Sequence, residues 1–138
     1  MKIAIINGPN LNLLGTREPS VYGKETFEKY YLQLQAKYPD ITFSYHQSNV
    51  EGELINFLHQ EGFASDGIII NPGGYTHTSV ALGDAIAAIK APVVEVHISN
   101  TAARESFRHI SHVSAHCKGT IIGLGLKGYE LAIIGLMG

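Results

Sequence analysis

Between Gly67 and Ser79 the chain reads Gly-Ile-Ile-Ile-Asn-Pro-Gly-Gly-Tyr-Thr-His-Thr-Ser. A β-branched run, residues 67–70, passes directly into a polar, glycine-rich loop, and an apolar segment at residues 78–90 follows. A short apolar run bounded by turn residues is typical of a strand that a sheet buries on both faces. The segment after the loop is rich in Ala, Leu and Ile, and we expect it to be a helix that stops before Ala91-Pro92.

Similar elements recur outward from this stretch in both directions. Further β-branched runs occupy residues 3–6, 41–45, 93–96 and 119–122. Longer segments lie between them, and their apolar residues have helical spacing. These segments predict helices at residues 27–38, at residues 50–58 after the capping-box signature Ser48-x-x-Glu51, from Asn100 or Thr101, and from Gly128 into the C-terminus.

Strands that alternate with helices at this spacing predict βαβ units and a parallel sheet covered on both faces. Five strands in 138 residues match an α/β, flavodoxin-like three-layer sandwich, whose sheet has the strand order 2-1-3-4-5. A closed barrel of such units needs about 250 residues. The sequence has no repeat, low-complexity tract or linker, so we expect one domain over residues 1–138.

Composition narrows the classes of protein to which the chain can belong. Hydrophobic residues make up 45% and charged residues 16%, which supports a packed core and excludes wholesale disorder. The formal net charge of −2 lacks the basic excess of proteins that grip nucleic acid. Cys117 has no second cysteine to pair with, and the apolar run at residues 3–6 is too short for a signal peptide or a membrane helix. We therefore expect a soluble, cytoplasmic protein with neither a nucleic-acid nor a membrane partner.

Polar residues gather where three of the predicted strands end. The loops that follow read Asn-Gly-Pro-Asn-Leu-Asn at residues 7–12 and Asn-Pro-Gly-Gly-Tyr-Thr-His at residues 71–77, and the fourth strand runs through Glu-Val-His-Ile-Ser-Asn at residues 95–100. In open α/β sheets, ligands bind beyond the carboxyl ends of the strands, where the strand order reverses. Each segment alone is also an ordinary turn former. Their coincidence at one edge of the sheet predicts a functional crevice there.

The segment after the first of these loops is unusually long. Residues 13–23 read Leu-Leu-Gly-Thr-Arg-Glu-Pro-Ser-Val-Tyr-Gly, without periodicity, whereas most βα connections have about 2–6 residues. Such a segment is either an ordinary surface loop or a lid over the crevice. As a lid, it would carry Arg17 and Tyr22.

Two other patterns mimic known sites. Residues 123–128 spell G-x-G-x-x-G after a strand, but too few residues follow for the second strand and acidic residue of a dinucleotide site, so we interpret them as a tight turn. His109, His112, His116 and Cys117 suggest a metal site. They span a predicted helix end and the start of a strand and need not share a face, so structural or surface roles are favoured.

Taken together, the chain closely resembles the type II 3-dehydroquinate dehydratases. The segments that carry the resemblance are residues 7–23, 71–82, 95–100, Ala103-Arg-Glu-x-Phe-Arg108 and Gly123-Leu-Gly-x-x-Gly-Tyr129. The resemblance implies dehydration of 3-dehydroquinate to 3-dehydroshikimate by anti elimination through an enolate, with no metal, Schiff base or other cofactor. The reaction serves either the biosynthesis of aromatic amino acids through the shikimate pathway or quinate breakdown.

The resemblance also implies roles for the residues that perform the reaction. Tyr22 would be the general base, and Arg17 would favour its phenolate. His97 would be the acid that protonates the departing C1 hydroxyl, oriented by Glu95. Asn10 would help to hold the enolate oxygen, through water.

Further residues would bind the substrate or join subunits. By resemblance, the substrate contacts are Asn71, His77, Ile98, Ser99 and Arg108, with the backbone amides at Ile98 and Ser99 holding the carboxylate. Asp84 would reach the site of a neighbouring subunit in an assembly built from trimers, commonly a dodecamer. The predicted helix at residues 78–90 is apolar nearly all round, which agrees with burial against both the sheet and another chain.

Two hypotheses from other classes compete with an enzyme. A flavodoxin-like module could bind a nucleotide or flavin without catalysis, but the first loop offers Asn and Pro rather than the Ser and Thr expected around a phosphate. A structural subunit would use its apolar helix only for packing, which leaves the three polar loops unexplained.

Overall fold

The computed structural model describes residues 1–16, 20 and 24–138. Its centre is a five-stranded parallel sheet in the order β2-β1-β3-β4-β5, which confirms the predicted flavodoxin-like topology. The strands are β1 (Lys2–Asn7), β2 (Thr42–Gln47), β3 (Gly67–Asn71), β4 (Val93–His97) and β5 (Gly119–Ile122). Every residue of β3 and β4 is buried, as their β-branched sequences predict.

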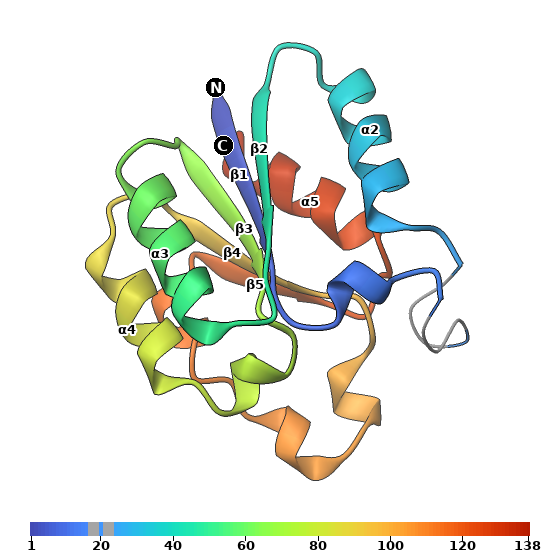
Figure 1. Ribbon diagram of the computed structural model, residues 1–138, viewed down its shortest axis with the longest axis vertical. Helices are drawn as coiled ribbons and strands as arrows, with labels where there is room; N and C mark the ends of the chain where they lie inside the picture. Colours follow the sequence, from blue (N-terminus) through green and yellow to red (C-terminus); the bar gives the residue numbers. More distant parts are fainter. Residues whose placement is uncertain (17–19, 21–23) are drawn as a thin grey trace.

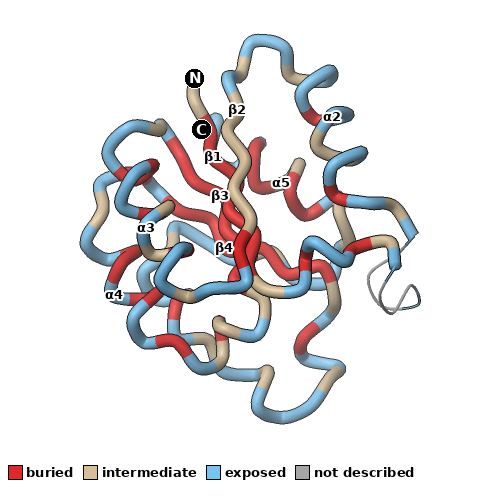
Figure 2. The backbone as a smooth tube through the Cα atoms, in the orientation of Figure 1, coloured by how far each residue is buried: buried red, intermediate tan, exposed pale blue. Residues whose placement is uncertain are grey.

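In the part of the chain that the structure describes, α-helices α2 to α5 cover the two faces of the sheet (Figure 1). Helices α2 (Phe27–Lys37) and α5 (Lys127–Leu136) pack on one face, with Ile3, Ile5 and Ile69 of the strands beneath them. Helices α3 (Glu51–Gly62) and α4 (Val80–Ala88) pack on the other, over the alternate strand residues. Figure 2 shows the resulting buried central layer. No helix in the described ranges is long and apolar enough to cross a membrane.

Two predicted helix starts need correction. The capping box at Ser48 does not form, because α3 begins at Glu51 with Val50 in the N-cap position. The Ser48 hydroxyl instead accepts a hydrogen bond from the Val50 N–H at 2.9 Å and donates one to Glu53. Helix α4 is also shorter than predicted, since Ser79 caps it by accepting from the Leu82 N–H at 3.0 Å.

The segment after β4 is not an α-helix, contrary to the prediction of a helix from Asn100 or Thr101. It contains three short 3₁₀ turns, η3 (Thr101–Ala103), η4 (Ser106–His109) and η5 (Ser114–His116). Side chains compete here with the helical backbone pattern: the Ser111 hydroxyl accepts from the N–H groups of Val113 and Ser114, at 3.1 and 3.0 Å. The chain therefore folds back as turns along the edge of the crevice.

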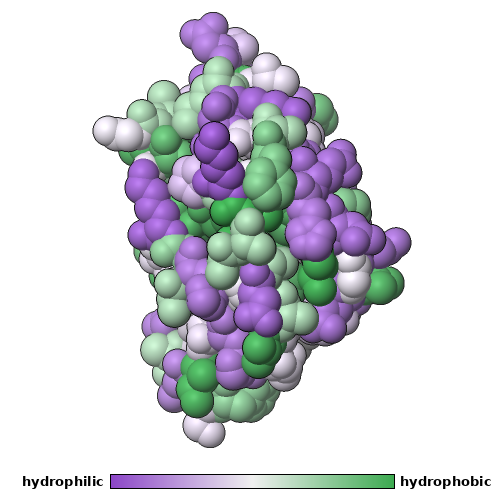
Figure 3. Space-filling view, turned by 90° about the vertical axis from the view of Figure 1, so that its left-hand side faces the viewer, coloured by the Kyte–Doolittle hydropathy of each residue, from purple (hydrophilic) through white to green (hydrophobic). Residues whose placement is uncertain are grey.

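Helix α4 buries one side and exposes the other. Leu82, Ala85 and Ile86 face the core, whereas Val80 and Asp84 are exposed. Figure 3 views the molecule from the side that carries α3 and α4, and there hydrophobic side chains are mixed with hydrophilic ones. The apolar helix thus has a second face that no described residue of the same chain covers.

Candidate active site

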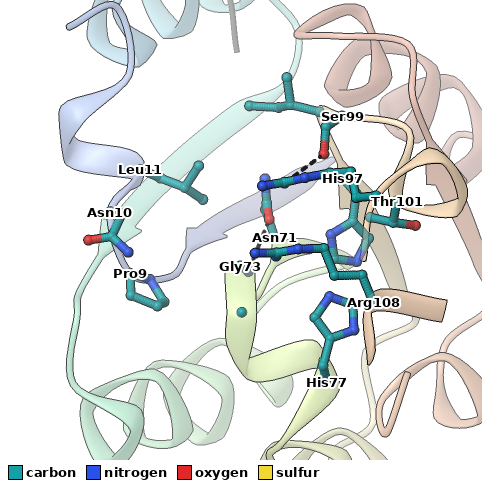
Figure 4. Close-up of a pocket in the computed structure, with 13 residues that line it drawn as sticks. Pro9, Asn10, Leu11, Asn71, Gly73, His77, His97, Ser99, Thr101 and Arg108 are labelled. Carbon is teal, nitrogen blue, oxygen red and sulfur yellow. Dashed lines mark hydrogen bonds between the residues drawn. The ribbon is translucent and has the colours of Figure 1, made fainter. Parts of the chain in front are cut away.

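A crevice lies at the carboxyl ends of β1, β3 and β4, where the sequence predicted it. Its lining comprises Pro9, Asn10, Leu11, Asn71, Gly73, Gly74, His77, His97, Ile98, Ser99, Thr101, Arg104 and Arg108. Figure 4 shows Asn10 and Leu11 on one side of the hollow, with His77, His97 and Arg108 on the other. The structure therefore brings together most of the residues that the resemblance singles out.

Four of those residues are not in this lining. Arg17 and Tyr22 lie outside the described residues. Asp84 is exposed on α4 and does not line the crevice of its own chain. Glu95 is fully buried behind His97 and forms a hydrogen bond with its ring.

Glu95 and His97 form a buried pair because alternate residues of a strand point to the same side. The distance from Glu95 Oε2 to His97 Nε2 is 2.5 Å. Thr76 Oγ1 donates to the same carboxylate oxygen at 2.9 Å, and Ser114 Oγ donates to the other oxygen at 2.5 Å. A third hydroxyl, that of Ser111, lies 3.3 Å from both oxygens. The carboxylate is thus surrounded by donors.

These donors determine the protonation of the pair. Burial alone raises the pKa of Glu95, but the hydrogen bonds from His97, Ser114 and Thr76 and the charge of His97 bring that pKa below its ordinary value. Glu95 is therefore a carboxylate near neutral pH, and His97 Nε2 carries the proton between them. The other ring nitrogen, Nδ1, remains for a ligand in the crevice.

His77 is the second imidazole of the crevice. Its Nδ1 lies 2.7 Å from the carbonyl oxygen of Ile110, so this nitrogen is the N–H donor. Burial lowers the pKa of His77. The hydrogen bond to the Ile110 carbonyl opposes this effect, and the positive charges of His97 and Arg108 lower the pKa further. His77 is therefore neutral near pH 7, with Nε2 as an acceptor.

Two arginines give the crevice positive charge. Arg108 lies over the ring of Phe107, with 4.7 Å from its guanidinium carbon to the ring centroid, and donates to Glu105 at 3.1 Å. Arg104 Nη1 donates to Ser99 Oγ at 3.2 Å. Arg104 was not among the predicted site residues, although it belongs to the motif at residues 103–108. A crevice with two guanidinium groups suits an anionic ligand such as a carboxylate.

The G-x-G-x-x-G segment supports the crevice from behind. Gly123 and Gly125 have φ angles of 87° and 63°, which glycine adopts readily. Their N–H groups donate to the carbonyl oxygens of His97 and Ile98, each at 3.1 Å. The segment is thus a tight turn, as interpreted from the sequence, and it fixes the backbone at the end of β4. Within the described residues, no three His, Cys, Asp or Glu side chains gather as a metal site.

Comparisons with known proteins cover the whole chain. The model of a family described as dehydroquinase class II matches residues 1–137. The 3-dehydroquinate dehydratase of Exiguobacterium sp. is 53% identical over 138 residues, which cover 99% of this chain and 94% of that protein. That of Roseiflexus castenholzii is 53% identical over 140 residues, covering 100% of this chain and 89% of the other.

Solved structures give the same assignment. The type II dehydroquinase from Butyrivibrio crossotus superposes with a TM-score of 0.94 at 47% identity, covering 100% of this chain and 98% of that one. A 3-dehydroquinate dehydratase-like protein from Bifidobacterium longum gives a TM-score of 0.71 at 27% identity, over 99% and 94% of the two chains. Sheet order, crevice and full-length similarity together show that the chain belongs to the class II dehydroquinases, the type II 3-dehydroquinate dehydratases.

Proposed function

We propose that the crevice converts 3-dehydroquinate to 3-dehydroshikimate by anti elimination of water through an enolate. The dehydratase activity follows from the family. The observation that carries the mechanism is the buried Glu95–His97 pair, which opens onto a cationic crevice. Such an elimination needs a base for the carbon beside the ketone, a stabiliser for the enolate oxygen and an acid for the leaving hydroxyl.

His97 is the proposed acid. Its imidazolium transfers a proton to the C1 hydroxyl, the C–O bond breaks, and the hydroxyl leaves as water. Glu95 holds the imidazole through Nε2 at 2.5 Å, which leaves Nδ1 directed to the crevice. Because Glu95 is fully buried among three hydroxyl donors, it orients the ring without competing for the substrate.

Tyr22 is the proposed base, and Arg17 the residue that favours its phenolate. A tyrosine phenol has an ordinary pKa of about 10, so it needs a close positive charge in a water-poor site to act near pH 7. A guanidinium is always charged and provides that field. These two roles rest on the resemblance of residues 7–23 to the family.

The remaining side chains of the crevice are proposed to bind the substrate. The N–H groups of Ile98 and Ser99 hold its carboxylate, beside the guanidinium groups of the crevice. Asn71, His77 and Arg108 contact its ring oxygens. Asn10, the one described non-glycine residue with a positive φ, at 71°, helps to hold the enolate oxygen through water.

A trimer-based assembly, commonly a dodecamer, is proposed to complete the site. Asp84 cannot act in the crevice of its own chain, since it lies exposed on α4. The exposed side of that helix also carries Val80, of which 60% is accessible in the single chain. A neighbouring chain that covers this side would bring Asp84 to a second crevice. A monomeric mass in solution would contradict this proposal.

The direct test is to mix the purified protein with 3-dehydroquinate and follow the ultraviolet absorbance of the conjugated enone product. Chelator and borohydride are added in parallel, and we expect absorbance to rise in the presence of either. Tyr22→Phe should abolish turnover, and Arg17→Ala should reduce it, while Tyr38→Phe, at a half-buried tyrosine outside the crevice lining, serves as a matched control. A folded parent chain without activity would overturn the proposed reaction, and near-normal turnover of Tyr22→Phe would overturn the assigned base.

A further inference from the structure

The hydroxyl of Tyr129 joins two asparagines at the bottom of the crevice. Asn7 and Asn71 end the adjacent strands β1 and β3 and are paired in the sheet register. Tyr129, on α5, donates to Asn7 Oδ1 at 2.8 Å and accepts from Asn71 Nδ2 at 3.0 Å. Only Asn71 of these three residues lines the crevice.

The number of protons on each group determines which way the Asn71 amide points. A tyrosine hydroxyl has one proton, and Tyr129 gives it to Asn7. Tyr129 can therefore only accept from Asn71, which must turn its NH₂ group toward the ring. On the other side, Asn71 Oδ1 accepts from the N–H of Gly73 at 3.1 Å. The amide oxygen is thus occupied, and the second N–H of Asn71 remains available to a ligand.

The hydroxyl itself cannot move away, because the ring is held on several sides. Tyr129 is 0% exposed. Its ring lies 4.9 Å from that of Phe27 and 6.3 Å from that of Tyr30, both at the start of α2. Gly128 beside it leaves room for α5 to approach β4, since a Cβ there would lie 3.2 Å from Val96. The position of the phenol oxygen is therefore fixed by the core rather than by solvent.

We propose that Tyr129 is a positioning residue for the dehydration. Its hydroxyl orients Asn71 as a hydrogen-bond donor to an oxygen of the substrate. This inference rests on the proposed function, in which Asn71 contacts the substrate. It assigns a role to the last motif of the chain, Gly123-x-Gly-x-x-Gly-Tyr129, whose tyrosine does not line the crevice. It also predicts that the crevice prefers an acceptor, a carbonyl or a hydroxyl oxygen, at this point.

The test is a double-mutant cycle with Tyr129→Phe, Asn71→Ala and the double variant, assayed for kcat and KM with 3-dehydroquinate. In the parent background, Tyr129→Phe should lower kcat/KM by about tenfold, the value of one hydrogen bond, mainly by raising KM. In the Asn71→Ala background the same change should have less than a twofold effect, because the group that Tyr129 orients is gone. Tyr38→Phe, which removes a hydroxyl bonded to Glu130 at 2.6 Å, is the matched control and should keep parental kinetics.

A second variant, Asn7→Ala, tests the same role with Tyr129 itself left unchanged. Asn7→Ala removes the acceptor of the Tyr129 proton, so that the hydroxyl can turn this proton toward Asn71 and compete with the Gly73 N–H for the amide oxygen. We expect a similar rise in KM, again absent in the Asn71→Ala background. A merely structural role would instead give additive losses in both backgrounds, which would overturn the inference, as would parental kinetics of Tyr129→Phe.

The cycle separates this inference from the proposed function. If Asn71→Ala itself has parental kcat/KM, the proposed contact between Asn71 and the substrate is wrong, and the inference falls with it. If Asn71→Ala is impaired but Tyr129→Phe and Asn7→Ala are not, the contact stands and only the orienting role of Tyr129 is wrong.

Discussion

A methyl group at Gly8 should damage both the stability and the activity of the protein. Gly8 follows β1 and its N–H donates to the carbonyl oxygen of Asn71 at 2.7 Å, which ties the loop after β1 to the loop after β3. A Cβ at this position would lie 2.5 Å from the Pro72 carbonyl oxygen and 2.8 Å from its carbon. Both are backbone atoms, so no side-chain rotation relieves the contact. The two loops must separate by almost an ångström to reach ordinary contact distance.

The cost follows from this displacement. Overpacking of a close-packed site costs about 1–3 kcal/mol, and weakening the hydrogen bond from Gly8 to Asn71 adds about 1 kcal/mol. We therefore expect Gly8→Ala to lower the free energy of unfolding by about 2–4 kcal/mol. The same shift moves Asn10 away from the opposite wall of the crevice, and a misplacement of about 1 Å costs about a hundredfold in rate.

Urea unfolding measures the loss of stability, and the absorbance assay for dehydration measures the loss of activity. Both are run at one fixed protein concentration, because assembly affects apparent stability. The matched control is Gly52→Ala in α3, where a Cβ would meet nothing within 4 Å. That variant should gain about 0.5–1 kcal/mol and retain parental kinetics, since alanine is the better helix former. If Gly8→Ala unfolds at the parental midpoint and turns over normally, the steric argument is refuted.

Three further predictions test the charged and buried groups. Glu95→Gln keeps the size of the side chain but removes the carboxylate that orients His97, and kcat should fall by about a hundredfold or more, measured by the absorbance assay. The pKa of Glu61 lies below its ordinary value because hydrogen bonds from His46 and two serine hydroxyls outweigh the effect of burial. Its charged form therefore stabilises the fold above the ordinary pKa of a glutamate, and that contribution is lost as the pH falls through the lower folded value. Glu61→Gln should cost about 2–3 kcal/mol at pH 7 in urea unfolding, and the difference from the parent should shrink toward pH 3. Burial, with the nearby charge of Glu95, raises the pKa of Cys117 to about 12. Iodoacetamide at pH 8 should therefore alkylate Cys117 far more slowly in the folded protein than in the protein unfolded by urea. Equal rates of alkylation would contradict this prediction.

The sheet could be predicted from the sequence because parallel strands buried on both faces have a distinctive composition. Residues 67–70 and 93–96 are apolar runs without alternation, apart from Glu95, and the structure buries all of them. The position of the crevice follows from the same pattern, since polar residues begin where those runs end. Helix boundaries were less predictable at Ser48 and Ser79, where a hydroxyl has several nearby N–H groups to accept from.

The region between β4 and β5 could not be predicted for a different reason. Its conformation depends on contacts with distant residues, such as the hydrogen bond from the His112 N–H to the Thr76 carbonyl oxygen at 2.8 Å. Likewise, Tyr129 looks in the sequence like any core residue of an amphipathic helix. Its hydrogen bond to Asn7 spans 122 residues, and only the folded chain shows that its hydroxyl ends among polar groups of the crevice.

The two faces of the sheet supply different parts of the proposed reaction. Glu95 and His97 point to the face of α3 and α4, where hydroxyls on the turns hold the carboxylate. Asn7 and Asn71 point to the opposite face, where α5 contributes the phenol of Tyr129. The proposed acid therefore belongs to one wall of the crevice, and Asn10 and Leu11 form the wall across from it (Figure 4).

An anti elimination requires the acid and the base to act on opposite faces of the substrate. In the sequence, the segment that carries Tyr22 follows η1 (Leu11–Leu13), whose residue Leu11 belongs to the wall that faces His97. Tyr22 itself lies outside the described residues, and the proposed mechanism needs it on the face of the substrate away from the imidazole. Deuterium placed stereospecifically at the carbon beside the ketone checks this proposed arrangement. Loss of the hydrogen on the same side as the leaving hydroxyl would contradict the proposed placement of acid and base.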